Sequence, residues 1–309
     1  PIWVSKDRTE IICIGSVEEL KTEIEKSVQA GIMDKNPLAD FVVNDFSKEN
    51  YDKIDLHRPY VDNIILVSET GQQLFREPDL IDVWFDSGAM PYAQLHYPFE
   101  HKDDFKNFFP ADFIAEGVDQ TRGWFFTLHA IAGMLFDSVA FKNIISNGLV
   151  LDKNGEKMSK RKGNTVDPFG AIEKYGSDAL RWYIITNSQP WDNLKFNIDG
   201  IDEVKRKFFG TLYNTYSFFA LYANVDNFTY KEKEIAINKR PEIDRWIMSI
   251  LNSLVKNVEE YYNNYEPTKA GRAIQEFVSD NLSNWYVRLN RKRFWGGKYD
   301  ENKLSAYQT

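Results

Sequence analysis

The chain has 309 residues, and its 46 Asp and Glu residues against 38 Lys and Arg residues give it a formal net charge of -8. That length suits about two domains, each with its own core. The acidic balance argues against a protein that coats nucleic acid, although it permits a local basic surface. No apolar run approaches the roughly 20 residues that a membrane span requires, so no membrane partner is expected.

Cys13 is the only cysteine, which excludes a disulfide framework and a Cys-rich zinc site. A reducing, cytoplasmic location is the simplest interpretation. The four histidines form no His-x-x-His or His-x-x-x-His pair, and we expect no metal held by protein side chains. The first residues carry neither an initiator Met nor a signal-peptide pattern, which indicates a segment cut from a longer protein.

Residues 1–80 are predicted to form a small mixed α/β region. A capping box, Ser16 with Glu19, starts a helix with apolar residues along one face. Residues 33–60 are polar and weakly periodic, which favours an ordered excursion outside the core. Two β-prone runs between 61 and 76 surround a Glu-Thr-Gly turn and predict a hairpin.

Residues 81–199 carry the pattern of a parallel sheet with a crossing helix. Strands are predicted at 111–115 and 141–146, on either side of a helix over 120–136. In an open parallel sheet, ligands bind at the carboxyl ends of the strands. The residues after the first strand and a basic segment at 157–164 would both lie at that edge, so the sequence predicts one shared site there.

Residues 200–309 are predicted to contain helices only. Apolar residues recur at helical spacing in four segments, 204–219, 241–261, 267–277 and 282–289. A polar stretch at 224–240 is predicted to connect the first two helices. This part therefore favours an all-α bundle, with the domain boundary near residue 200.

The most unusual stretch is basic. Four cationic side chains fall within the six residues Lys157-Met158-Ser159-Lys160-Arg161-Lys162. An Asn-Gly turn precedes the run and a Gly-Asn pair ends it, which predicts a loop between ordered elements. A solvated basic loop is the ordinary interpretation of such a cluster. The alternative is an anionic ligand, because like charges this close together repel each other.

A second group of polar residues follows the first predicted strand of the sheet. Asp119 alone would be explained as a helix cap, but that leaves Glu116, Gln120 and Trp124 without a role. A carboxylate can hold an α-ammonium group, Gln and Asp can bind ribose hydroxyls, and a Trp face can wall an apolar pocket. The combination favours a binding site.

These motifs resemble those of class I aminoacyl-tRNA synthetases. The run Glu-Gly-Val-Asp-Gln-Thr-Arg-Gly-Trp-Phe at 116–125 is similar to the isoleucyl form of the active-site motif. The basic loop is similar to the KMSKS-type loop, with Arg161 where the commonest form has Ser. Asp-Leu-His-Arg-Pro-Tyr at 55–60, Asp-Val-Trp-Phe-Asp-Ser-Gly at 82–88 and Asn-Gly-Leu-Val at 147–150 agree with this resemblance, which extends from residue 1 to about residue 295.

The resemblance implies a fold and a division into domains. The fold is α/β, the second half of a Rossmann-like nucleotide-binding domain with a small mixed α/β insertion, followed by an all-α helical bundle. Residues 1–80 would be the connective insertion, residues 81–199 the second half of the catalytic domain, and residues 200–309 the start of a helical anticodon-binding domain.

The resemblance also implies a reaction. The parent protein would be a ligase that uses ATP to convert isoleucine to isoleucyl-adenylate and then transfers it to tRNA(Ile), with Mg²⁺ accompanying ATP and held mainly by phosphate and water. The family's His-x-Gly-His motif and its editing insertion do not occur in these residues, so we expect the isolated chain to be inactive without the upstream half of the same protein. A valyl-tRNA synthetase fragment and a non-catalytic tRNA-binding module are the alternatives.

Residue by residue, the resemblance assigns the following roles. Glu116 and Gly117 would contact the adenylate, with Asp119 and Gln120 at its amino-acid and ribose portions, Gly148, Leu149 and Met158 near the adenine and nucleotide, and Trp84 and Trp124 lining the isoleucine pocket. Trp84 as an ordinary core residue is the alternative. Lys157 and Lys160 would approach the ATP phosphates and stabilise the charge that develops there in the transition state.

The last basic cluster lies in a predicted helix. Arg288, Arg291 and Lys292 fall on one face at three- and four-residue spacing, with Arg293 beside them. A solvated helix face is the ordinary interpretation. The resemblance favours a tRNA-binding surface, on which the cations meet phosphates and a neighbouring aromatic residue, Phe294 or Trp295, stacks on a base.

Overall fold

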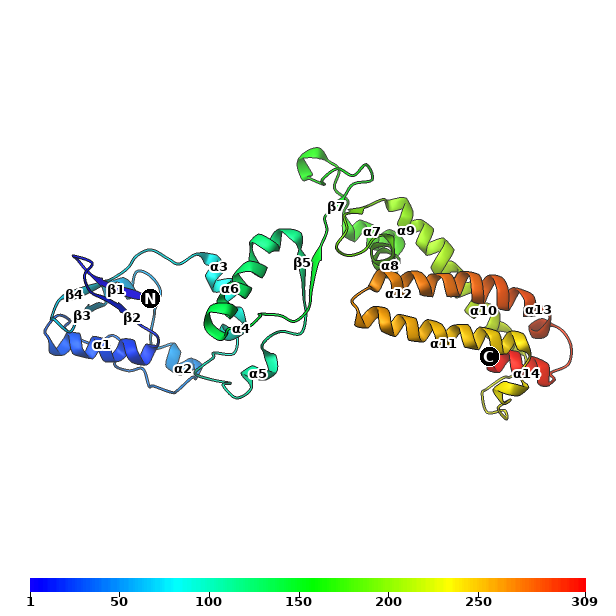
Figure 1. The fold of residues 1–309 in the computed structure, drawn as a ribbon, viewed down its shortest axis with the longest axis horizontal. Coiled ribbons are helices and arrows are strands. Elements are labelled where there is room, and N and C mark those ends of the chain that lie inside the picture. Colours follow the sequence, from blue (N-terminus) through cyan, green and yellow to red (C-terminus); the bar gives the residue numbers. More distant parts are fainter. The chain divides into compact units, whose positions relative to one another are not determined.

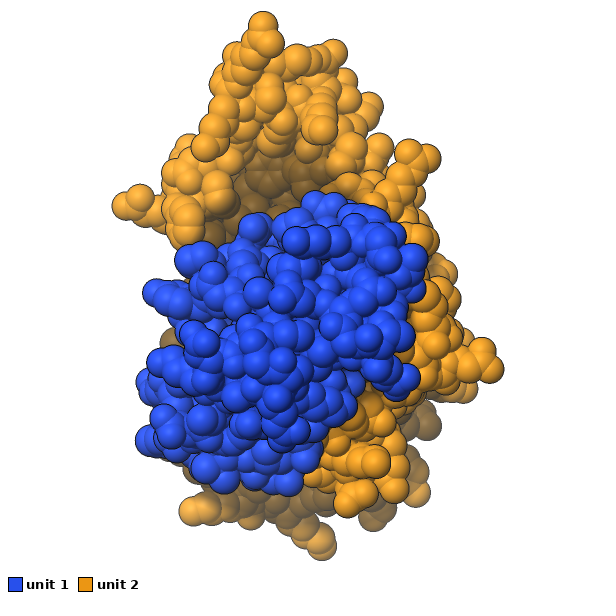
Figure 2. All heavy atoms as spheres, turned by 90° about the vertical axis from the view of Figure 1, so that its left-hand side faces the viewer, with its two compact units in different colours: residues 1–86 blue, residues 87–309 orange.

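The computed structural model describes all residues from 1 to 309. They form two compact units, Pro1–Asp86 and Ser87–Thr309. Figure 1 traces the chain as a ribbon, and Figure 2 colours the first unit blue and the second orange. Among the helices, none combines the length and the apolar character needed to cross a membrane.

The first unit contains a four-stranded antiparallel sheet in the order β2-β1-β4-β3. Its strands are β1 (Ile2–Ser5), β2 (Ile11–Cys13), β3 (Ile65–Val67) and β4 (Gln73–Arg76). The pair β3 and β4 confirms the predicted hairpin. The pattern gave no indication of β1, although β1 pairs with both β2 and β4 and its Trp3 is completely buried, with the indole N–H donating to the Ile64 carbonyl at 2.9 Å.

Two helices complete this unit, α1 (Val17–Gln29) and α2 (Lys48–Tyr51). Ser16 caps α1 by accepting a hydrogen bond from the Glu19 amide, and the Glu19 carboxylate accepts one from the Gly15 amide. A short 3-10 turn, Val61–Asn63, precedes β3. Leu38 and Phe41, from the polar stretch predicted to lie outside the core, are buried with the sheet and α1.

The second unit begins with short helices and a parallel strand pair. The helices are α3 (Val83–Gly88, which starts at the end of the first unit), α4 (Met90–Ala93), α5 (Phe105–Phe108) and α6 (Trp124–Phe136), and the strands are β5 (Ile114–Gly117) and β6 (Ile144–Asn147). β5 and β6 pair in parallel, as predicted. Both strands start about three residues later than expected because Ala111 and Phe141 form only an isolated bridge.

Helix α6 also starts later than the apolar pattern predicted. A 3-10 turn, Val118–Arg122, takes the place of its first turn. The inner face of α6 packs Leu128, Ile131 and Ala132 against an aromatic cluster from the preceding loop. In that cluster Phe105 and Phe109 stack with ring centroids 5.1 Å apart. This packing fixes the helix that follows the 116–120 segment.

A second parallel pair, β7 (Val150–Leu151) and β8 (Leu194–Lys195), forms the base of the basic loop. In the chain, α7 (Pro168–Tyr175), which is capped by Asp167, and α8 (Ser177–Asn187) lie between these strands. Helix α9 (Ile198–Val204) follows β8 and packs its fully buried Ile201 into the same core.

The rest of the unit is helical. A π-helical segment, Lys205–Phe209, leads into α10 (Gly210–Val225), and the predicted polar connection, with a 3-10 turn at Ile237–Lys239, leads to α11 (Glu242–Asn263). Helix α12 (Pro267–Glu276) continues through a π-helical segment, Phe277–Val287, into α13 (Arg288–Trp295), and α14 (Glu301–Gln308) ends the chain. Figure 1 shows α11 running beside α12, with α13 continuing the path of α12, and α13 contacts both α10 and α14.

Candidate functional site

The ends of β5 and β6 bring two predicted site segments together. The parallel register pairs Glu116 with Ser146 and Gly117 with Asn147. Both strands therefore end at the same edge of the sheet, where residues 118–120 follow β5 and Gly148 follows β6. The Glu116 side chain is exposed to solvent. A Cβ atom at Gly117 would lie 2.5 Å from Asp119 Oδ1, so a larger residue there would displace the Asp119 carboxylate.

The 3-10 turn after β5 orients the next polar residues. Gln120, and not Asp119, satisfies the start of α6, since its Oε1 accepts a hydrogen bond from the Trp124 amide at 2.9 Å. The Gln120 Nε2 donates to Asp119 Oδ2 at 3.1 Å. The capping explanation for Asp119 is therefore wrong. The exposed Asp119 carboxylate has a second oxygen, Oδ1, which does not take part in this hydrogen bond and can accept one from a ligand.

The two tryptophans assigned to the isoleucine pocket lie in different units. Trp124 is partly buried, and its indole N–H donates to the Ser87 carbonyl at 2.9 Å. Trp84 lies in α3 with 43% of its surface exposed, so it is not an ordinary core residue within its unit. Because Trp84 belongs to the first unit and Trp124 to the second, their joint role in one pocket stays a prediction.

Gly148 and Leu149 occupy a tight backbone crossing between β6 and β7. The Gly148 amide donates to the Pro190 carbonyl at 2.9 Å, and the Leu149 amide donates to Asn193 Oδ1 at 2.8 Å. A Cβ atom at position 148 would lie 2.2 Å from the Asp192 carbonyl oxygen, a backbone atom. Only glycine fits this crossing. Sequence reasoning missed Asn193 because nothing near it in the chain marks its partner, which is 44 residues away.

The basic loop is held by a small polar network. Asn164 Nδ2 donates to Asp152 Oδ2 at 2.9 Å, and its Oδ1 accepts from the Ser159 amide at 2.9 Å. The hydrogen bond from Asn164 and those from the backbone of Glu156 and Asn154 lower the pKa of Asp152. The Met158 side chain packs against the core that α7, α8 and α9 share. From the sequence, Asn164 was predicted only as part of the turn that ends the loop, and Asp152 was not named. Together these two residues hold the two ends of the loop in place.

The cations of the loop differ in their partners. Lys162 lies in a one-turn 3-10 segment, Lys160–Lys162, and forms an ion pair with Glu156 at 2.7 Å, which raises the pKa of Lys162. Lys157 and Lys160 are exposed and belong to no ion pair. The loop therefore offers two uncompensated ammonium groups on a backbone that is fixed by neutral and acidic neighbours.

No hydrogen bond or ion pair joins the 116–120 segment to the loop at 157–164. The edge of β5 and β6 brings 116–120 together with Gly148, and the loop follows through β7. The convergence of both segments on one nucleotide stays a prediction. No group of three or more His, Cys, Asp or Glu side chains lies close enough to hold a metal ion.

The basic helix α13 divides its cations between two environments. Arg288, Arg291 and Lys292 are exposed, and Trp295 is 52% exposed. Phe294 is only 3% exposed and belongs to the core of the bundle, so the expectation that it stacks on a base is wrong.

Arg293 points into the bundle. Its Nη1 and Nη2 donate to the two oxygens of the fully buried Asp244 at 2.6 and 2.8 Å. Ser305 Oγ and Tyr286 Oη donate to the same carboxylate. Burial acts to raise the pKa of Asp244, but the hydrogen bonds from Arg293 and Ser305 outweigh it and the pKa is lowered. Arg293 thus has a structural partner that its three neighbours lack.

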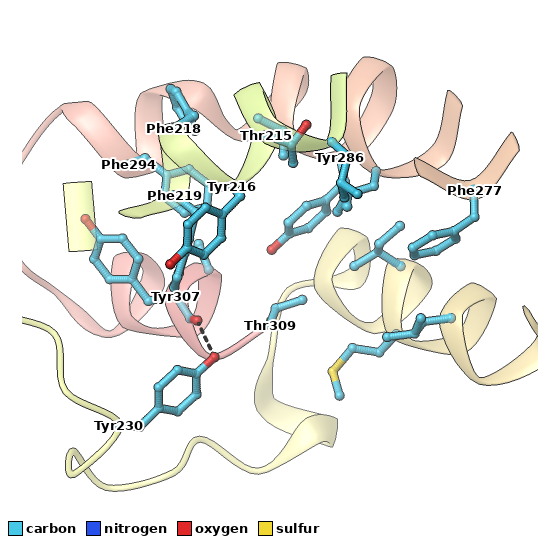
Figure 3. A pocket seen from close by; sticks show the side chains of 17 residues that line it. Thr215, Tyr216, Phe218, Phe219, Tyr230, Phe277, Tyr286, Phe294, Tyr307 and Thr309 are labelled. Carbon is cyan, nitrogen blue, oxygen red and sulfur yellow. Dashed lines mark hydrogen bonds between the residues drawn. The ribbon is translucent and has the colours of Figure 1, made fainter. Parts of the chain in front are cut away.

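The bundle also contains an apolar cavity of about 360 Å³ between α10, α11, α14 and the π-helical segment Phe277–Val287, with Phe294 of α13 beside them. Figure 3 shows the aromatic side chains that surround it, including Tyr216, Phe219 and Tyr286. Tyr230 Oη donates to the Tyr307 carbonyl at its edge, at 3.4 Å. No charged side chain lines this cavity, so it is unsuited to phosphate.

Comparisons with known proteins agree with these observations. Residues 1–197 match the family model described as tRNA synthetases class I (I, L, M and V). Residues 244–309 match the model described as the anticodon-binding domain of tRNA ligase.

Curated relatives match over the whole chain. Isoleucine–tRNA ligase from Bacteroides thetaiotaomicron is 73% identical over all of this chain, and that from Thermus thermophilus is 46% identical. In both cases the chain spans 27% of the relative's length. The chain is therefore similar to about a quarter of each of these proteins.

Solved structures show the fold. A LeuRS–tRNA–LeuAMS ternary complex from Agrobacterium radiobacter aligns with 99% of this chain and 35% of its own, with a TM-score of 0.62 and 17% identity. Methionyl-tRNA synthetase from Mycobacterium tuberculosis, bound by methionyl-adenylate, aligns with 94% of this chain and 55% of its own, with a TM-score of 0.60 and 16% identity. These likenesses confirm the predicted fold class.

Proposed function

Because this chain belongs to the class I tRNA synthetases, we propose that it is part of an isoleucine–tRNA ligase. The parent protein would form isoleucyl-adenylate from isoleucine and ATP and transfer the isoleucyl group to tRNA(Ile). Relatives named isoleucine–tRNA ligase, at 72% and 73% identity, support isoleucine over valine. The predicted division into 1–80, 81–199 and 200–309 belongs to this proposal, as does the cytoplasmic location. The two family matches, 1–197 and 244–309, support its second boundary.

One observation carries the chemistry. Lys157 and Lys160 are exposed and unpaired in a loop that Asn164 and Asp152 hold in place, whereas Lys162 is neutralised by Glu156. When the isoleucine carboxylate attacks the α-phosphate of ATP, a bond forms to phosphorus and pyrophosphate leaves. Negative charge then gathers on the phosphoryl oxygens. Ammonium groups already positioned there stabilise the transition state more than the ground state. Mg²⁺ would enter with ATP, held by phosphate and water.

The polar residues at the β5–β6 edge would hold the other parts of the adenylate. The exposed Glu116 carboxylate suits the α-ammonium group of isoleucine, and Asp119 and Gln120 suit ribose hydroxyls. Gly148 and Leu149 would face the adenine through their backbone. Trp84 and Trp124 would enclose the isoleucine side chain. In α13, Arg288, Arg291 and Lys292 would meet tRNA phosphates, and Arg293 would support them through Asp244.

The test of the reaction is ATP–pyrophosphate exchange by the whole protein that contains this chain, with isoleucine or valine as substrate. We expect isoleucine to be preferred and Lys160→Ala to lower the rate by about 100-fold, the loss typical of one transition-state charge contact. Lys162→Ala is the matched control and should cost much less, because Glu156 already occupies that ammonium group. Preference for valine would assign valyl specificity, and RNA binding without any exchange would indicate a non-catalytic module.

The tRNA-binding face of α13 has its own test. Replacing Arg288 and Arg291 with Ala should weaken tRNA binding and flatten its salt dependence by about 0.7 to 0.9 per lost phosphate contact. The same substitutions should leave thermal stability nearly unchanged, since both side chains are exposed. Unaltered affinity together with an unaltered salt slope would remove this face from the proposal.

A further inference from the structure

The second unit can be divided at the crossing between β6 and β7. Residues 87–147 (the sheet segment) end in the strand pair that presents Glu116. Residues 150–309 (the helical segment) carry the loop at 157–164 and the bundle. The proposed reaction needs both segments, because the contacts to the adenylate lie on the first and the loop lysines on the second. The angle between the segments therefore decides whether both sets of side chains can act on one substrate.

The segments meet at the crossing and again at a pair of aromatic rings. At the carboxyl end of β6, the Gly148 amide donates to the Pro190 carbonyl at 2.9 Å. At the amino end of β5, the ring of Phe113 stacks on the ring of Tyr265, with centroids 5.0 Å apart and planes 10° from parallel. The four residues of β5 put about 13 Å of strand between these two junctions.

The sheet segment holds Phe113 by its neighbours on both sides. The Asp112 carbonyl accepts a hydrogen bond from Asn143 Nδ2 at 2.9 Å, and the Ile114 amide donates to the Asn143 carbonyl at 3.0 Å. These hydrogen bonds fix the backbone that carries the ring against the start of β6. Phe113 is 43% exposed, so it is not a core residue of the sheet segment. Its ring is available for the contact with Tyr265.

The helical segment holds Tyr265 in the turn between α11 and α12. Its φ is +56°, in the left-handed region, where glycine is the usual residue at the end of a helix. The Tyr265 amide donates to the Tyr262 carbonyl at 3.0 Å, and the Glu266 amide donates to the Tyr261 carbonyl at 2.8 Å, which is the Schellman pattern. A tyrosine here costs backbone strain that glycine would avoid. The ring that justifies this strain is the one stacked on Phe113.

The same turn is attached to α8, which leads to the crossing. Thr268 Oγ1 donates to the carbonyls of Ile185 and Ser188, at 2.7 and 3.0 Å. Arg272 Nε donates to the Thr186 carbonyl at 2.8 Å. Two residues beyond Ser188, the chain reaches the carbonyl that binds the crossing. A continuous hydrogen-bonded path therefore runs from the stack, through the start of α12 and the end of α8, to the crossing.

We propose that Phe113 and Tyr265 are positioning residues, whose stack fixes the angle between the sheet segment and the helical segment. The inference rests on the proposed function and deepens it. Held by the crossing alone, the sheet segment would turn about one end of its strands, and the stack at the other end opposes that rotation. Glu116 and the loop lysines are then held around one adenylate. Both aromatic residues act through the groups that they place, and small misplacements of such groups slow a reaction strongly.

The test is ATP–pyrophosphate exchange by the whole protein that contains this chain, measured without RNA. Phe113→Ala and Tyr265→Ala should each lower kcat by about two- to tenfold, the factor that corresponds to one aromatic pair, with the KM values for ATP and isoleucine nearly unchanged. The double variant should lose no more than the slower single variant, because both substitutions remove the same contact. Tyr265→Phe keeps the ring and should exchange at the wild-type rate.

Two further variants separate positioning from stability. Tyr265→Gly removes the ring and relieves the left-handed backbone, so it should melt at a higher temperature than Tyr265→Ala and yet exchange as slowly. A rate that recovered together with the melting temperature would show a merely structural role and overturn the inference. Tyr262→Ala, at an exposed tyrosine in the last turn of α11, is the matched control and should leave kcat unchanged.

The remaining outcomes distinguish the inference from the function on which it rests. Exchange at the wild-type rate in both alanine variants would overturn the inference and leave the proposed function intact. Losses that multiply in the double variant would overturn it as well, because the two rings would then act separately. A wild-type protein without exchange would contradict the proposed function itself, and the inference would fall with it.

Discussion

At the scale of single residues, replacing glycine with alanine should have opposite effects on stability at two positions, Gly148 and Gly133. Gly148 lies against the Asp192 carbonyl, whereas Gly133, exposed on α6, has no atom within 4 Å of the position that a Cβ atom would take. Gly148→Ala should lower the free energy of unfolding by about 1–3 kcal/mol, the usual cost of overpacking. Gly133→Ala should raise it by about 0.5–1 kcal/mol, since alanine is the better helix former. Urea unfolding of both variants tests this, and equal stabilities would contradict the tight crossing at β6 and β7.

The buried carboxylate of Asp244 should stabilise the folded chain. Removing this fully buried carboxylate by Asp244→Ala leaves the Arg293 guanidinium without its partner, and should cost about 3–5 kcal/mol of unfolding free energy. Glu259→Ala, at an exposed site on the same helix, is the control.

The same carboxylate makes stability depend on pH. Its pKa is lower in the folded chain than the value of about 3.9 expected when unfolded, so its contribution is complete above that value. The contribution is lost as the pH falls through the folded pKa. Urea midpoints measured from pH 6 down to pH 2.5 should show a loss of stability below about pH 4 that is smaller in Asp244→Ala. An identical acid limb in both proteins would exclude this role.

At the scale of elements, the basic loop depends on the hydrogen bonds of Asn164. In Asn164→Ala, the Ser159 amide loses its acceptor and Asp152 loses its only side-chain donor while it keeps those from the backbone, so the loop lysines should be less well positioned. We expect the ATP–pyrophosphate exchange rate of the whole protein to fall by about tenfold, as a positioning effect, with little change in melting temperature. The pKa of Asp152, followed by NMR, should rise toward its ordinary value. An unchanged pKa with an unchanged rate would show that Asn164 does not hold the loop.

Elements defined by local signals were predictable, whereas those defined by distant partners were not. Ser16 caps α1, Asp167 caps α7, and the Glu-Thr-Gly turn connects β3 to β4. Each of these signals lies within a few residues of the element that it predicts. Strand β1 is only four residues long, too short for an alternation of apolar and polar residues to identify it. It is held in the sheet by β4, about 70 residues later in the chain. The start of α6 was misplaced because Gln120 caps it from a 3-10 turn that interrupts the helical pattern.

The same distinction applies to the candidate site. Lys157, Lys160, Glu116 and Gln120 could be named because they lie in short motifs. The ion pair of Arg293 with Asp244 could not be predicted, because the two residues are 49 positions apart in the chain.

At the scale of the whole molecule, the first unit has its own core and should fold alone. Its buried residues all lie between Trp3 and Leu74. A chain of residues 1–80 would contain Trp3 as its only tryptophan, so fluorescence reports on that core directly. We expect a cooperative urea transition with a stability of about 3–5 kcal/mol, as for other small domains. Emission typical of a solvated indole, without a transition, would show that this core depends on the second unit.

The outer face of α6 has a consequence for behaviour in solution. Phe126, Met134 and Leu135 are each more than 60% exposed, and β5 and β6 form a two-stranded sheet whose outer edges have no strand neighbour. Apolar contact and strand pairing both favour self-association. The net charge of -8 opposes it by long-range repulsion, which physiological salt confines to about 8 Å. The chain should therefore be colloidally most stable in dilute buffer. Salt would weaken the proposed contacts with RNA and at the same time strengthen the contacts of the chain with itself.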